Sequence, residues 1–259
     1  TSGTITLNAQ SISADYSGLA ADVKAAFAGI TTQTGKITLT DASVSVTDIN
    51  TVAGVTSGEV TATVTSAAAS VLNGLTTTST DAITMTVNAE ASSAATQASD
   101  LVSLNGKTNQ VITMTAVTKV SGSYADLLDV YVTNAGQYNG EGDEAVTITG
   151  TVTAAQADAI ADVTSGVVTA TIDADTAAAL NVALVDSGSQ VNAYNLTING
   201  TTATASEITN LDNKTSGNIT LSGTSMTITV ASGETLNLSG VTNSLSGTLT
   251  INDSTGDNN

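Results

Sequence analysis

The sequence predicts an α/β repeat solenoid, in which parallel strands stack and a short helix or loop precedes each strand. Three observations predict this fold. Residues 100–113 align without a gap on residues 207–220, apolar residues alternate with threonine in short segments, and pairs of apolar residues three positions apart precede those segments. A repeat cannot bury its apolar face alone and therefore stacks on its neighbours. The alternatives are an all-β solenoid and a β-sandwich array.

A second, looser internal alignment supports the repeat. Residues 151–166 align with residues 43–58, and both copies continue into Val-Thr-Ala-Thr. The shared pattern is an apolar residue, two polar residues, an apolar residue, a Thr/Ser/Asn/Gly turn and an alternating strand.

The helices are indicated by the apolar pairs. Leu101 and Leu104, like Ile208 and Leu211, make a narrow apolar stripe on one or two helical turns. The Ser-Gly or Asn-Gly turn that follows is expected to end each helix with a residue in a left-handed or otherwise strained conformation. The same spacing occurs at Ile49 and Val52, Leu72 and Leu75, and Ala157 and Ile160.

The strands are indicated by strict alternation, which places apolar side chains on one face and hydroxyls on the other. Strands separated by a helix need a crossover connection, so they are expected to be parallel, with right-handed crossovers. Predicted strands begin near Thr4, Lys36, Val60, Ala82, Val111, Val146, Val167, Tyr194 and Asn218.

The chain divides into a strand-helix solenoid over residues 1–223 and a β-rich tail over residues 224–259. The helical pattern disappears in the tail, where residues 226–230, 235–238 and 248–251 are strand-like. The segment from Tyr131 to Glu144 is longer than the other connections, and we expect it to project from the helical and loop side.

Composition excludes several functions. The chain has no Cys and no His, which removes a Cys nucleophile, His-dependent acid/base catalysis and disulfides. The 23 acidic residues lack an aromatic sugar platform, because the chain has five Tyr and one Phe. We therefore expect no enzyme. Five Lys against a net charge of −18 disfavour nucleic acid and anionic membranes, and no apolar run is long enough to span a bilayer.

Residues 211–217 (LDNKTSG), 121–126 and 142–149 resemble the β-strand-repeat modules of very large secreted surface proteins of bacteria, notably cyanobacteria. The resemblance covers most of residues 36–223. It implies an extracellular structural protein that self-assembles as a surface layer or filament. The expected partners are copies of itself, joined head to tail through ends that carry strand-like alternation at residues 4–7 and 247–251.

A ligand-binding adhesin or phage fibre is the alternative function. Such a protein would grip cell-surface glycan through residues 124–144, where Tyr124, Tyr131 and Tyr138 stand close to acidic residues. Self-assembly of the purified chain without a ligand distinguishes the two functions.

Calcium is the one cofactor that the sequence indicates. Glu141, Asp143 and Glu144 stand among glycines, where their oxygens could converge on a hard cation. Asp173 with Asp175 is a second candidate, and Asp253 with Asp257 is a third. The alternative interpretation of each is a solvated acidic loop.

Threonine pairs recur in the predicted strands. Stacked on parallel strands, they would form two outward columns about 4.7 to 4.9 Å apart, as in ice-binding β-solenoids. The alternatives are glycan attachment, lateral sheet contact, or a strand-forming polar face that keeps the protein soluble. The pairs are Thr38/Thr40, Thr61/Thr63, Thr84/Thr86, Thr113/Thr115, Thr147/Thr149 and Thr169/Thr171.

Overall fold

The computed structural model describes residues 8–30, 32–185 and 191–253. Within them the protein is a mixed α/β fold, with strands in three sheets that do not close into a barrel. The chain forms two compact units, each described by itself. Unit 1 contains the residues up to 120 together with 132–141, and unit 2 contains 121–131 and the residues from 142 onward.

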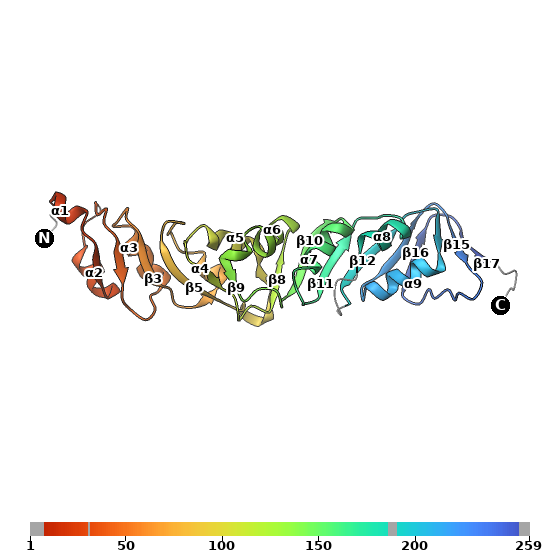
Figure 1. Cartoon of the computed structure of the whole chain (residues 1–259), viewed down its shortest axis with the longest axis horizontal. Coiled ribbons are helices and arrows are strands. Elements are labelled where there is room, and N and C mark those ends of the chain that lie inside the picture. Colours follow the sequence, from red (N-terminus) through yellow and green to blue (C-terminus); the bar gives the residue numbers. More distant parts are fainter. Residues whose placement is uncertain (1–7, 31, 186–190, 254–259) are drawn as a thin grey trace. The chain divides into compact units, whose positions relative to one another are not determined.

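Unit 1 alternates short helices with short strands (Figure 1). Two elements, β8 (Lys119–Gly122) and the π-helical turn η2 (Asp129–Thr133), contain residues of both units. The helical segments of unit 1 are α1 (Ala9–Ile12), α2 (Ala20–Ala26), α3 (Val46–Ala53), α4 (Ala69–Leu72), η1 (Ala91–Ser93), α5 (Ala98–Asn105) and η3 (Ala135–Gln137). Its strands are β1 (Tyr16–Gly18), β2 (Ile37–Leu39), β3 (Val60–Thr63), β4 (Ala67–Ala68), β5 (Ala82–Asn88), β6 (Thr96–Gln97), β7 (Ile112–Thr113) and β9 (Tyr138–Asn139).

The main sheet of unit 1 is a parallel ladder in chain order, β1-β2-β3-β5-β7-β9, with β4 beside β5. Tyr16 pairs with Ile37, which pairs with Val60. Further along, Ile112 pairs with Tyr138. We call the segment from one strand of such a ladder to the next a repeat.

Unit 2 has two parallel ladders. Its helices are α6 (Tyr124–Leu128), α7 (Ala154–Ala161), α8 (Ala177–Ala183) and α9 (Ala205–Lys214), and each packs on the next (Figure 1). One ladder contains β10 (Ala145–Val152), β11 (Val168–Ile172), β12 (Ala193–Ile198), β14 (Ile219–Gly223) and β16 (Val241–Leu245). The other contains β13 (Thr202–Thr204), β15 (Met226–Val230) and β17 (Leu249–Asp253).

Among the described helices, α3, α6, α7, α8 and α9 each begin after a Ser or Thr whose hydroxyl caps the first turn. Thr153 and Thr204 accept the N–H of the residue three positions later and form capping boxes with Gln156 and Glu207. The apolar pairs that indicated the helices lie in or directly after α3, α4, α5, α7 and α9, and all of them are buried. This part of the prediction is confirmed.

The strand predictions are confirmed for eight of the nine starts, each within one residue, and every pairing observed in either unit is parallel. The ninth, at Thr4, lies outside the described residues. Ile112 and Ile219 are buried as expected, while their neighbours Thr113 and Thr220 are half-buried. After α9 ends at Lys214, the described chain contains no helix up to residue 253, as expected of the tail.

One strand of the tail was predicted in the wrong place. Residues 235–238 are irregular, and β16 follows them at Val241. The Asn237 side chain accepts the N–H of Ser239, and Val241 donates to the carbonyl of Leu238. Such local bonds favour a turn over the ladder.

The segment between Tyr131 and Glu144 does not simply project, contrary to expectation. Tyr131, Tyr138 and Glu144 are all buried. Tyr138 takes the place next to Ile112 in the ladder, and its hydroxyl donates to the carbonyl of Leu101 at 3.1 Å. This part of the segment is therefore core.

Candidate functional site

The acidic loop expected to bind calcium is divided between the two units. Glu141 belongs to unit 1, whereas Asp143 and Glu144 belong to unit 2. Asp143 is exposed, but Glu144 has no accessible surface. Glu144 is therefore not part of a solvated acidic loop.

Within unit 2 the Glu144 carboxylate has its own hydrogen bonds. Its Oε2 accepts the N–H of Gly142 at 2.8 Å and the hydroxyl of Tyr131 at 3.2 Å. Its Oε1 has no hydrogen-bond partner among the described residues. Burial raises the pKa of Glu144, and this effect outweighs the opposing hydrogen bonds.

The other carboxylate candidates remain on the surface. Asp173 and Asp175 are exposed after β11, and Asp175 Oδ1 accepts the N–H of Thr176. Asp253 is exposed at the end of β17, and Asp257 lies outside the described residues. In the part of the chain that the structure describes, no three acidic residues come together in a group that could hold a metal ion. Calcium binding stays a prediction.

The tyrosines proposed as a glycan platform are largely inaccessible. Tyr131 and Tyr138 are buried, and Tyr124 is half-buried at the start of α6. Sugar rings stack on exposed aromatic faces, so this segment offers little of the surface that such binding needs.

Most of the specific polar contacts join one repeat to the next. In three Thr-Ser-Gly turns the threonine hydroxyl donates to a carbonyl of the preceding repeat and accepts the N–H of the glycine. The distances to the carbonyl oxygens are 2.8 Å for Thr56 to Gly35, 2.8 Å for Thr164 to Glu144 and 2.7 Å for Thr215 to Tyr194.

The glycines of these turns are required for a reason other than the one expected. None of Gly58, Gly166 and Gly217 has a positive φ. Instead, a Cβ on each would lie 2.4, 2.0 and 2.2 Å, respectively, from a carbonyl oxygen of the preceding repeat. The left-handed conformation predicted from the Ser-Gly sequence is therefore wrong here, and close backbone approach replaces it.

Lysine side chains also join neighbouring repeats, through ion pairs or through hydrogen bonds to backbone carbonyls. Lys36 pairs with Glu59 of the next repeat at 3.2 Å, and Lys24 on α2 pairs with Asp48 on α3, which lowers the pKa of Asp48. Lys107 donates to the carbonyl of Leu75 at 2.6 Å, and Lys214 donates to carbonyls at the end of α8. Cations at the carbonyl end of a helix are favourable.

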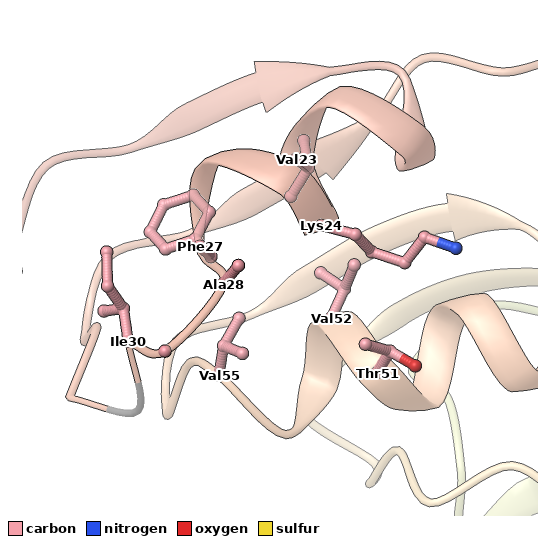
Figure 2. A pocket seen from close by; sticks show the side chains of 9 residues that line it. Val23, Lys24, Phe27, Ala28, Ile30, Thr51, Val52 and Val55 are labelled. Carbon is pink, nitrogen blue, oxygen red and sulfur yellow. The ribbon is translucent and has the colours of Figure 1, made fainter. Parts of the chain in front are cut away.

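An apolar pocket of about 200 Å³ lies in unit 1 between α2 and α3 (Figure 2). Val55 stands directly before the Thr of its turn, as Lys107 does in a later repeat. The Val55 carbonyl accepts the N–H of Gln33 of the preceding repeat, but its short side chain does not extend along that repeat as the Lys107 side chain does. The pocket is smaller than the roughly 300 to 1,000 Å³ of ligand sites. It is lined by Val23, Lys24, Phe27, Ala28, Gly29, Ile30, Thr51, Val52 and Val55.

The threonine columns do not run as predicted. Thr38 pairs with Thr61, but Thr61 then pairs with Ala82 and Thr63 pairs with Thr84. The column therefore shifts by two residues at β5. In unit 2 the register shifts again within β10, where Gly150 has a φ of 81°. These shifts break the flat lattice that ice binding would need.

No family model, curated protein or solved structure matches the chain. None of the helices in the described ranges has the length and apolar character that crossing a membrane requires. The described polar side chains thus make contacts chiefly between neighbouring repeats.

Proposed function

We propose that the protein is a structural repeat protein of the bacterial cell exterior, whose copies assemble into a surface layer or an extracellular filament. The observation that supports this proposal is the Thr-Ser-Gly turn. The threonine hydroxyl donates to a carbonyl of the preceding repeat, and the absence of a Cβ on the glycine lets the two backbones approach closely.

Each unit is, in this proposal, a solenoid. The ladders follow chain order, and a helix or short connection separates most successive strands. A stack of this kind is stabilised by contacts between neighbours and presents long side faces, which suits a mechanical role.

An exterior location agrees with the composition and with the resemblance to secreted bacterial surface proteins. The chain has no Cys, so its stability is independent of the redox compartment, and its charge of −18 favours solubility. The adhesin alternative loses its tyrosine platform, because Tyr131 and Tyr138 are buried.

The test is assembly of the purified chain without any ligand. Light scattering over a concentration series and negative-stain microscopy should show fibres or sheets, with and without calcium. A strict monomer at high concentration would contradict the proposal. Binding to a glycan array by such a monomer would favour the adhesin instead.

A further inference from the structure

One position of the repeat, directly before a threonine that contacts the preceding repeat, carries lysine in two repeats and valine in another. Thr56, Thr108 and Thr215 are equivalent. Each hydroxyl donates to a carbonyl of the preceding repeat and accepts the N–H of the residue two positions later. The residues before these threonines are Val55, Lys107 and Lys214.

In the two repeats with lysine, the ammonium group binds carbonyls at the end of the preceding helix. Lys214 donates to the carbonyl of Asn181 at 3.0 Å and to the carbonyl of Leu184, directly after α8. Lys107 donates to the carbonyl of Leu75, shortly after α4, at 2.6 Å. The alkyl stem of each lysine therefore spans the distance between two repeats, and its charge meets the negative end of the helix.

The corresponding place beside Val55 is the pocket between α2 and α3 (Figure 2). Residues 20–28 of the α2 region align without a gap on residues 177–185 of the α8 region, and the buried positions coincide. On this alignment, the two residues whose carbonyls bind the lysine ammonium at the end of α8 correspond to Lys24 and Phe27. Both Lys24 and Phe27 line the pocket.

We propose that this pocket binds a small linear alkylammonium ion, the group that a lysine side chain supplies in the two other repeats. The alkyl chain of the ligand packs against Phe27, Ile30 and Val52, and its ammonium group donates to the carbonyls of Lys24 and Phe27. This inference does not depend on assembly of the protein and goes beyond the proposed function.

The size and access of the pocket suit such a ligand. Its volume is about 200 Å³, and a cavity of roughly 150 Å³ already holds benzene, so an amine of about four carbons fits. Ala28, Gly29 and Thr51 line the pocket and are exposed, so the ligand enters from solvent. The Phe27 oxygen accepts the N–H of Ile30 at 2.9 Å and has a second lone pair for the ligand.

Charge favours a cation over a neutral or anionic ligand of the same size. The ammonium group of Lys24 is paired with Asp48, and Figure 2 shows the Lys24 side chain extending away from Phe27 and Ile30. The net charge of −18 raises the concentration of small cations near the surface. The apolar lining separates an alkylammonium ion from a metal ion, which would find no carboxylate among the lining residues.

The test measures binding of n-butylammonium by saturation-transfer NMR, which detects the ligand and works for single chains and large assemblies alike. A dissociation constant of about 1 to 10 mM is expected for so small a ligand. Two probes separate its parts: n-butanol has the alkyl chain without the charge, and methylammonium has the charge without the chain. Each should bind at least fivefold more weakly than n-butylammonium.

Val55→Lys places the protein's own ammonium group in the pocket. This variant should melt at a higher temperature and bind n-butylammonium at least tenfold more weakly than the unsubstituted protein. Val71→Lys is the matched control, because Val71 is 56% exposed on α4 of the same unit and does not line the pocket, and it should leave binding unchanged.

Three results would each overturn the inference: equal binding of n-butanol and n-butylammonium, undiminished binding by Val55→Lys, or a Val55→Lys protein that does not fold. The last would show that the pocket has no room for a lysine side chain. None of these results bears on the proposed assembly, which is tested separately on the unsubstituted protein.

Discussion

At the scale of single residues, the glycine of each Thr-Ser-Gly turn determines how closely two repeats approach. The Cβ that any other residue would bring has no room against the preceding carbonyl. The sequence alone cannot distinguish this requirement from a left-handed turn, because both favour glycine and both follow a helix.

Replacing Gly58 with alanine should therefore destabilise the protein by about 2 to 3 kcal/mol, since its Cβ would lie 2.4 Å from the Gly35 oxygen. Chemical denaturation of both proteins checks this value. Gly136→Ala is the control in the same unit, because a Cβ there meets nothing within 4 Å. Equal stability of the two variants would show that the repeats are not so closely packed.

The buried Glu144 should make stability depend on pH. Its folded pKa is raised above the ordinary value, so its contribution is complete below the unfolded pKa and is lost as pH rises through the folded pKa. Glu144→Gln removes this loss, and the variant should gain stability relative to the unsubstituted protein as pH rises from about 4.5 to 8.

Melting temperatures of the two proteins over that range test the prediction. Asp173→Asn is the control, because Asp173 is an exposed carboxylate of the same unit. A constant difference between Glu144→Gln and the unsubstituted protein at all pH values would contradict a titrating Glu144.

At the scale of elements, each short helix contributes its apolar pair to the core. Leu104 on α5 and Leu211 on α9 have no accessible surface. Either leucine replaced by alanine should lower the free energy of unfolding by about 2 to 4 kcal/mol. Urea denaturation measures this loss. Val71→Ala and Val182→Ala, on exposed positions of α4 and α8, should each cost less than about 0.5 kcal/mol.

The elements that could be predicted are those with periodic patterns. Strict alternation located β5 and β14, and the apolar pair with its three-residue spacing located α5 and α9. Strands β4 and β6 are two residues long, too short to show a period, and β1 reads Tyr-Ser-Gly without alternation. Such strands exist because a neighbouring repeat provides their hydrogen bonds.

The candidate site was less predictable than the fold. Acidic residues among glycines indicated an exposed cation loop, yet Glu144 faces inward because the Gly142 N–H and the Tyr131 hydroxyl satisfy one of its oxygens. The repeat contacts had a visible signal, since Thr-Ser-Gly recurs before β3, β11 and β14. Its meaning depends on contacts between residues 20 or 21 positions apart.

At the scale of the whole molecule, the 23 acidic residues far outnumber the five lysines. The net charge is −18, and the lysines at positions 24, 36, 107 and 214 are engaged between repeats by ion pairs or by hydrogen bonds to backbone carbonyls. Mutual repulsion of the carboxylates opposes both folding and association of copies.

Divalent cations should therefore raise the melting temperature by several degrees and promote assembly. Differential scanning calorimetry in millimolar calcium and in EDTA measures this effect, with sodium chloride at the same ionic strength as the control for screening. Identical melting in calcium and EDTA would count against any role for divalent ions.

The position of the lysines between repeats has a consequence for resistance to proteolysis. A protease of the trypsin type cuts after Lys or Arg and needs a locally unfolded segment in its cleft. This chain has no Arg, and its lysines lie in or beside helices and strands, with Lys107 and Lys214 tied to the backbone of the preceding repeat. Digestion at these lysines must wait for a repeat to open, so the folded protein should outlast its unfolded form in an environment rich in such proteases.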